Sequence, residues 1–274
     1  RLEEGIALCD SQKDTLVVLG SSQNPKVTCL CHGAFALWSL GYPDQAQQRS
    51  HDALTLAYEL SHPYSLGLAL SFSANVHQLR REVRPVQEQR ALMTLATEQG
   101  FPLYLALGTI WRGWALAVQG QIEEGTSQIR QGLDAWRAMG TEMWRPFLVS
   151  LLVEAYGKGE QVEEGLTVLA EALAAVNRSE ERMYEAELYR LKGELTLQKG
   201  ARDWGLGVGS SPQAPSLKPQ VSNGAEREAE EYFLKAIDIA RQQQAKSWEL
   251  RASTSLARLW QQQDKREDAR QLLA

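Results

Sequence analysis

The residues of this chain that could do chemistry are few, and their spacing does not favour it. Cys29, Cys31 and His32 form the strongest cluster of metal-ligating types. If this segment is helical, side chains two positions apart point about 200° from each other. The two thiols then cannot reach one zinc ion, so we interpret them as buried small side chains and expect no metal site.

Patterns for nucleotide binding and for covalent catalysis are also absent from the sequence. The glycine-rich stretch 205–211 lacks the following Gly-Lys-Ser/Thr and the preceding strand of a phosphate-binding loop. The histidines, His32, His51, His62 and His77, form no HExxH motif and have no nearby pair of carboxylates. Because serine is abundant and histidine scarce, no Ser/His/Asp order can be argued. We therefore expect a non-catalytic chain without a cofactor.

Composition excludes several further classes of protein. The chain has 274 residues, 43% apolar and 23% charged, as in soluble globular proteins. A net charge of -5 disfavours a nucleic-acid binder or a protein of anionic membranes. The 3 cysteines suit a reducing compartment, and neither a membrane-spanning apolar run nor a signal-peptide pattern is found. We expect a cytoplasmic chain with neither nucleic-acid nor membrane partners.

A repeat with a period of about 40 residues organises the sequence. A small residue is followed seven positions later by a small or apolar one, and an aliphatic residue comes directly after it. The first residues of the pattern are Ala46, Pro85, Gly125, Gly165 and Ala229, with Gly5 and Ala269 in the same phase. The gap between Gly165 and Ala229 is longer than the others. It equals one period plus the stretch 201–224, whose glycines and prolines are typical of a surface loop. Trp204 could anchor that loop as a flap over a groove, but a tolerated insertion is the simpler interpretation.

The sequence of each repeat predicts two amphipathic helices. The segment from Leu103 to Gln119 is apolar on a helical period and ends at Gly120, and Gly41, Gly159 and Gly200 end the matching segments. A short polar or acidic turn then leads into the second helix. Since one helix pair cannot bury its apolar face alone, we predict an all-α solenoid of stacked antiparallel pairs. It spans residues 1–274 as a single array, with repeats at about 1–25 (partial), 26–63, 64–102, 103–142, 143–182, 183–247, which contains the 201–224 insertion, and 248–274 (partial).

The spacing and the small residues resemble tetratricopeptide repeats, which implies a right-handed superhelix. That family expects a small residue seven before the end of each first helix, where this chain has Ala34, Ser73, Gly113, Gly193 and Ala257. The fourth repeat departs from the pattern, with Leu152 and one extra loop residue. The stretches 37–46, 96–102, 112–117, 187–194 and 256–260 are together similar to the C-terminal repeats of bacterial signalling proteins. Those proteins combine an adenylate/guanylate cyclase or a DNA-binding module with a signal-transduction ATPase. Neither chain end has a polar capping repeat, which suggests a segment of a longer protein.

The resemblance also places a candidate groove, because the first helix of each tetratricopeptide repeat lines the concave face. The candidates are chosen from the positions three, six and ten before the end of each first helix, with Trp111 added to them: Phe35, Trp38, Leu70, His77, Ile110, Trp111, Trp114, Arg190, Glu194 and Arg258. Packing between long helices is the competing interpretation for the tryptophans. An apolar N-terminal half would suit an amphipathic helix of a partner, and the arginines would suit an acidic motif.

The sequence thus predicts a protein–protein interaction or scaffold module, binding a protein, a peptide or another domain of the same parent chain. The resemblance implies the regulatory or sensor repeat region of an ATPase or cyclase. The alternative is a small-molecule sensor of the kind found in signal-transduction ATPases and transcription regulators, which would be favoured by a closed pocket of Trp111, Trp114 and His77.

Overall fold

The computed structural model describes residues 2–11, 23–82, 86–207 and 223–274, and all of its regular elements are helices. The chain forms two compact units, Arg1–Thr141 and Glu142–Ala274, which we call unit 1 and unit 2. Unit 1 contains α1 (Leu2–Ser11), α2 (Pro25–Ser39), α3 (Pro43–Leu60), α4 (Pro63–Leu79), α5 (Val86–Glu98), α6 (Pro102–Val118) and α7 (Ile122–Ala138). Unit 2 contains α8 (Arg145–Lys158), α9 (Val162–Ser179), α10 (Glu185–Gly207), α11 (Asn223–Gln242), α12 (Lys246–Gln262) and α13 (Arg266–Leu273).

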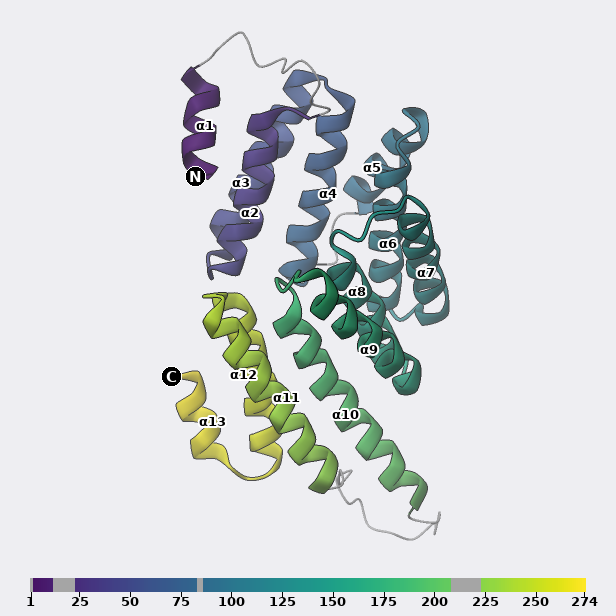
Figure 1. Ribbon diagram of the computed structural model, residues 1–274, viewed down its shortest axis with the longest axis vertical. Helices are drawn as coiled ribbons and strands as arrows, with labels where there is room; N and C mark the ends of the chain where they lie inside the picture. Colours follow the sequence, from purple (N-terminus) through teal and green to yellow (C-terminus); the bar gives the residue numbers. More distant parts are fainter. Residues whose placement is uncertain (1, 12–22, 83–85, 208–222) are drawn as a thin grey trace. The chain divides into compact units, whose positions relative to one another are not determined.

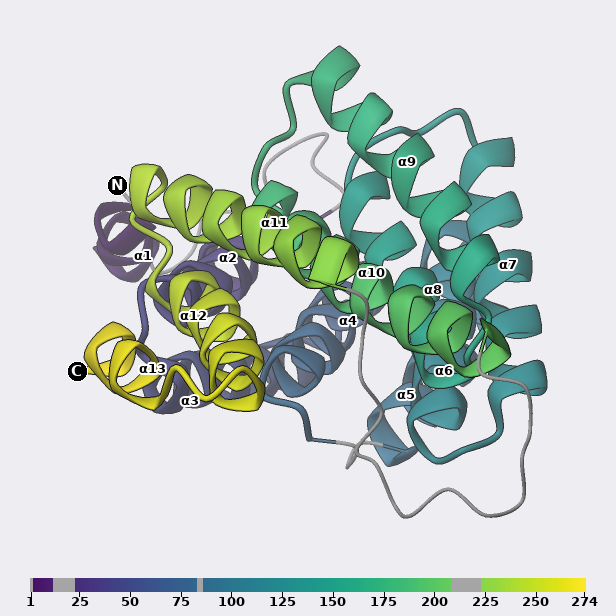
Figure 2. The same ribbon diagram turned by 90° about the horizontal axis from the view of Figure 1, so that it is seen from below.

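Within each unit, consecutive helices pack as pairs, and the pairs stack (Figure 1). In unit 1, α2 packs on α3, α4 on α5 and α6 on α7, while α4 also contacts the first helices of both neighbouring pairs, α2 and α6. Unit 2 repeats the scheme: α8 packs on α9, α10 on α11 and α12 on α13, and α10 contacts both α8 and α12. Both views place α6 between α5 and α7 (Figure 2). The predicted all-α fold of stacked helix pairs is confirmed for the described residues, and the single array over both units stays a prediction.

Small residues let the two helices of a pair approach closely. A Cβ atom added to Gly113 of α6 would lie 2.6 Å from the carbonyl oxygen of Gly125 in α7, so the two backbones touch there. In unit 2, a Cβ on Gly193 of α10 would lie 2.5 Å from the ring of Phe233, which is fully buried in α11. Ala46 and Ala229 of the repeat pattern are also completely buried, whereas Pro85 lies outside the described residues. The repeated small positions are therefore the places where helix meets helix.

The structure corrects two of the predicted helix ends. Gly41 and Gly120 adopt the left-handed conformation after their helices, as predicted, but in the fourth repeat the left-handed residue is Glu160, with a φ of 56°, rather than Gly159. The turns after α6 and α8 therefore have equal length, and the extra loop residue expected in the fourth repeat does not exist.

Gly200 does not end a helix either, so the predicted start of the insertion at 201 is wrong. Gly200 is buried inside α10, which continues to Gly207, and its last turns are held to α9 by an ion pair between Arg202 and Glu163. Ala201, Arg202 and Asp203 contain no helix breaker, so helix continues until the glycines accumulate. Trp204, the suggested anchor of a flap, lies in this added helix and is half-exposed. Residues 208–222 of the insertion lie outside the described residues.

Candidate functional site

Half of the predicted groove residues belong to the core. Trp38, Leu70, Ile110, Trp111 and Trp114 are all buried. Phe35 and His77 are partly accessible. This burial fits the packing interpretation of the tryptophans, and the five residues form no open apolar groove. Neither of the two described cavities, which lie between helices of unit 1, is lined by Trp111 or Trp114.

The predicted phase of the second repeat is wrong by one residue. Its first helix is followed by a left-handed Arg81, with a φ of 61°, which is eight residues after Ser73 instead of seven. Counting back from Arg81 places Gln78, rather than His77, at the position equivalent to Trp38, and Asn75 at the position equivalent to Phe35. Both amides are buried, and neither the Asn75 Oδ1 nor the Gln78 Oε1 has a hydrogen-bond partner among the described residues.

His77 instead lines a polar cavity of about 280 Å³ between α3, α4 and α5. Its Nδ1 lies 2.8 Å from a carboxylate oxygen of Glu82, and its Nε2 lies 3.9 Å from Glu88. Ser73 donates a hydrogen bond of 2.5 Å to Glu88 instead of to the histidine. Because the hydroxyl is held by the carboxylate, this Ser/His/Glu group lacks the serine–histidine contact that activates a nucleophile.

Glu82 ties the end of α4 to the turn that follows it. Besides His77, the Nε of Arg80 donates to Glu82 over 2.9 Å, and the Nη1 of Arg80 donates to Asp44 of α3 over 3.1 Å. Burial raises the pKa of Glu82, but the hydrogen bonds from Arg80 and His77 lower it by more, so the pKa lies below its ordinary value. This group therefore stabilises the fold as a carboxylate.

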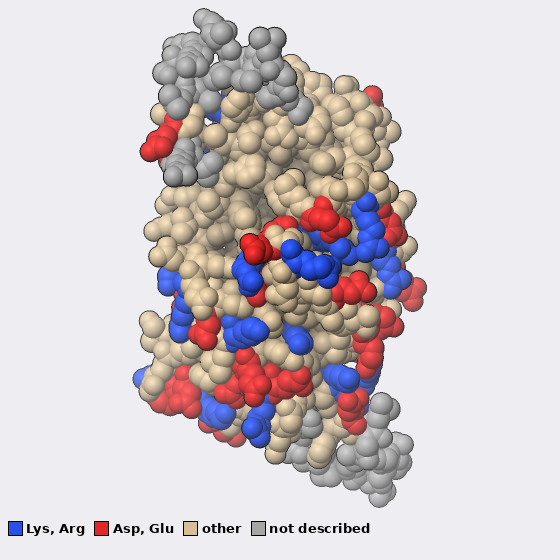
Figure 3. Space-filling view, in the orientation of Figure 1, with Lys and Arg blue, Asp and Glu red and all other residues tan. Residues whose placement is uncertain are grey.

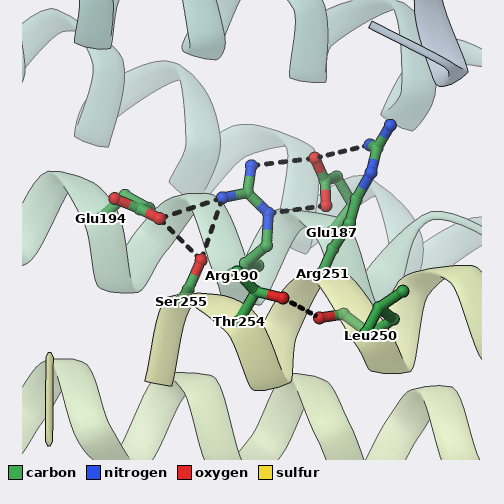
Figure 4. A network of polar contacts seen from close by, with 7 residues as sticks. All are labelled: Glu187, Arg190, Glu194, Leu250, Arg251, Thr254 and Ser255. Atoms are coloured by element: carbon green, nitrogen blue, oxygen red, sulfur yellow. Dashed lines mark hydrogen bonds and ion pairs between the residues drawn. The ribbon is translucent and has the colours of Figure 1, made fainter. Parts of the chain in front are cut away.

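The predicted arginine of unit 2 is the centre of a buried ion-pair network between α10 and α12 (Figure 4). The Nε and Nη2 of Arg190 donate to the two carboxylate oxygens of Glu187 over 2.8 and 2.9 Å. The Nη1 donates to Glu194 over 3.1 Å and to the hydroxyl of Ser255 on α12 over 3.4 Å. Ser255 in turn donates to Glu194, and Arg251 of α12 lies 3.4 Å from Glu187.

The positive and negative charges of the network neutralise one another. Burial lowers the pKa of the Arg190 guanidinium, but the charges of Glu187 and Glu194 and their hydrogen bonds raise it by more, so the pKa lies above its ordinary value. Only 11% of the Arg190 side chain and 6% of the Glu187 side chain are exposed. Arg190 is already paired with two carboxylates of its own chain. It therefore stabilises the packing of α10 on α12 and is not left unpaired for the carboxylate of a ligand.

Arg258, the last predicted groove residue, is different because it is exposed and has no ion-pair or hydrogen-bond partner among the described residues. It lies on α12 one turn after Thr254, which lies one turn after Leu250. Leu250 is 62% exposed, more than any other large apolar side chain among the described residues. On the face in Figure 3, many charged side chains gather over the region of α12 and α13.

Metal and membrane sites are not evident in the described part of the chain. No three acidic, histidine or cysteine side chains there lie close enough together to hold a metal ion. Cys31 is fully buried, and burial raises the pKa of its thiol. No described helix combines the length and the apolar character needed to cross a bilayer.

These helix pairs define the class of the protein: it has a helical-repeat fold. A comparison with solved structures finds a crystal structure described as the apo form of RapI, a helical-repeat solenoid, with a TM-score of 0.56 and 9% sequence identity. The match covers 98% of this chain and 86% of that one, and at this identity it shows the fold alone. No family model and no curated protein matches the sequence.

Proposed function

We propose that this chain is a non-catalytic module that binds a segment of a protein on the outer face of α12. The observation that carries the proposal is the stripe of Leu250, Thr254 and Arg258, one helical turn apart, of which Leu250 and Arg258 are exposed. An exposed apolar side chain followed by a cation without a partner suits recognition of an apolar and an acidic side chain together.

The geometry of the stripe defines what such a segment would look like. Leu250 and Arg258 are eight residues apart, which is about 12 Å along the helix axis. An amphipathic helix that carries an apolar residue and a carboxylate two turns apart on one face matches this spacing. The Arg190 network fixes α12 against α10 before any partner arrives, so little conformational entropy is lost on binding.

The resemblance to the repeats of bacterial cyclase and ATPase signalling proteins supports a regulatory or sensor role within a larger cytoplasmic protein. The partner would then be another domain of the same parent chain or a separate protein of the same pathway.

The test is capture of partners from lysate on the immobilised chain, with variants of the stripe and a matched control. We expect the capture of proteins by the wild type to be lost with Leu250→Asp and weakened with Arg258→Glu. Arg266→Glu makes the same charge change on exposed α13 and should keep them. Capture that persists in both stripe variants would refute the α12 face, and a wild type that captures nothing specific would refute the module itself.

Small-molecule sensing is a second candidate function. The pocket of Trp111, Trp114 and His77 that would have favoured it is not among the described cavities. A different cavity, between α5 and α6, favours it instead.

A further inference from the structure

The larger of the described cavities lies in unit 1, between the N-terminal half of α5 and the C-terminal half of α6, and measures about 490 Å³. Arg90 and Gln89 line it from α5, and Arg112 and Gln119 line it from α6. Met93 and Leu116 supply apolar surface between them. Small-molecule sites in proteins typically measure about 300–1,000 Å³ and combine apolar walls with a few convergent polar groups.

The cavity follows from how α6 packs on its two neighbours. At Gly108, α6 lies tightly on α5, because a Cβ there would come within 2.8 Å of the Met93 side chain. Further along, Gly113 brings the backbone of α6 against that of α7. The side of α6 that carries Arg112 and Gln119 therefore has no tightly packed neighbour, and a wedge opens toward the start of α5.

The polar groups of this wedge have few partners in the described chain. Arg90 makes no ion pair or hydrogen bond there. Arg112 has only Glu124, at 3.7 Å, beyond hydrogen-bond distance, and both side chains are about half exposed. Gln89 is 7% exposed, and its amide has no hydrogen-bond partner among the described residues. The amide lines the cavity with its hydrogen-bonding groups unused by the described chain, so it is available to a ligand there.

We propose that this cavity binds a small organic carboxylate with an apolar body. The carboxylate would lie between the guanidinium groups of Arg90 and Arg112, which form strong charge-assisted hydrogen bonds with such an anion. The apolar body would lie on Met93 and Leu116, and Gln89 would bond a carbonyl or hydroxyl group of the ligand. The inference rests on the second candidate function, small-molecule sensing, and is independent of protein binding at α12 in unit 2.

The contrast with Arg190 supports the assignment. Both places bring arginine to a helix–helix junction, but Glu187 and Glu194 neutralise Arg190, whereas the α5–α6 cavity has no carboxylate among its lining residues. A site that binds an anion must leave its cations available: Arg90 has no partner among the described residues, and Arg112 has only Glu124 at 3.7 Å.

The experiment is calorimetric titration of the full chain with hexanoate. Hexanol serves as the probe with the same body and no charge, and inorganic phosphate as the probe with charge and no body. We expect saturable binding of hexanoate, much weaker binding of hexanol and no competition by phosphate. Arg90→Gln and Arg112→Gln should each weaken hexanoate binding by about tenfold or more. Arg137→Gln, at an exposed site on α7 of the same unit, should leave it unchanged.

A second variant separates binding from misfolding. Ala115→Met places a larger side chain into the cavity without touching its charges and should abolish binding while the circular dichroism spectrum stays native. Three results would each overturn the proposal: no saturable binding of hexanoate at millimolar concentration, equal binding by the Arg90 and Arg112 variants, or full competition by phosphate. A capped acidic peptide that binds where hexanoate does not would also overturn it, in favour of a protein contact. None of these outcomes bears on the α12 variants, so the two proposals fail separately.

Discussion

Replacing Glu187 by glutamine should be among the most damaging conservative changes in unit 2. The carboxylate receives both parallel hydrogen bonds of the Arg190 fork, over 2.8 and 2.9 Å, and also lies 3.4 Å from Arg251. The amide of Glu187→Gln keeps the shape of the side chain but has no charge and only one acceptor oxygen. Arg190 would then keep its hydrogen bond to Glu194 but lose the buried bidentate partner, and the charge of Glu187 would also be lost to Arg251.

The magnitude follows from the burial of the pair. Removing one member of a buried ion pair costs about 3–5 kcal/mol, because the other charge remains buried without compensation. Arg190 keeps Glu194 and Ser255 in the variant, so we expect the lower end, about 3 kcal/mol. Glu194→Gln is the matched control: this side chain is 36% exposed and receives only one bond from Arg190, so its loss should cost about 1 kcal/mol.

A double variant tests whether the residues act as a unit. Glu187→Leu with Arg190→Met removes both charges and fills the space with apolar side chains, so it should cost less than the sum of the single variants by about 2 kcal/mol. Urea unfolding followed by circular dichroism gives the free energies of unfolding. Hydrogen exchange of the α10 and α12 amides shows whether the loss is local, which matters because the two units can unfold in separate steps.

Two results would refute this reasoning. If Glu187→Gln cost no more than Glu194→Gln, the buried bidentate contact would not be the source of stability. If the double variant cost the sum of its parts, Glu187 and Arg190 would not be coupled, and the network in Figure 4 would be a set of independent surface contacts.

Two further predictions concern unit 1. Gly113→Ala should cost about 2–3 kcal/mol of unfolding free energy because its Cβ would collide with the α7 backbone. Gly33→Ala, whose Cβ would meet only an ordinary contact at 3.8 Å, should be neutral or stabilising by up to about 1 kcal/mol, and similar losses for both glycines would contradict the packing argument. Glu82→Gln should show a pH dependence: the lowered pKa of Glu82 means that bonds from Arg80 and His77 stabilise the fold above the unfolded pKa of about 4.3, and that this stability is lost as the pH falls. We therefore expect the variant to be less stable than the wild type by about 1 kcal/mol at pH 7, with a difference that shrinks as the pH falls below about 4.3; urea unfolding that shows a constant difference would contradict this.

The repeat pattern was readable from the sequence because it depends on local rules. Helical periodicity, glycine after a helix and small residues at contact points each act within one or two turns, and together they predict the helix pairs. The predicted phase of the repeats is wrong where Arg81 or Glu160 occupies the left-handed position. Neither arginine nor glutamate favours that conformation, so the sequence does not mark these positions. A shift of one residue rotates the expected face by about 100°, which is why His77 was placed in a groove and lies in a polar cavity instead.

Only part of the network around Arg190 could be predicted from the sequence. Glu187, Arg190 and Glu194 are spaced by three and four residues, which is a visible signal of contacts on one helix face. Arg251 and Ser255 come from α12, more than 60 residues away, and only the stacking of α12 on α10 brings them to the arginine. Sequence reasoning therefore found the residue but assigned it to ligand binding, because it could not count the carboxylates that already surround it.

Whether a polar residue is scaffold or site depends on what remains unsatisfied around it, and this chain offers both cases. Arg190 is nearly saturated by its own carboxylates, so another anion would gain little and would have to displace Glu187 or Glu194. Arg90 and Arg112 face a cavity that has no carboxylate among its lining residues, so an anion there would compete only with the long contact of 3.7 Å between Arg112 and Glu124. Arg258 is exposed and lines neither of the described cavities, and a single ion pair on an exposed surface contributes only about 0–1 kcal/mol. Binding at α12 must therefore draw most of its affinity from the apolar contact at Leu250, and Leu250→Asp should weaken capture more than Arg258→Glu does.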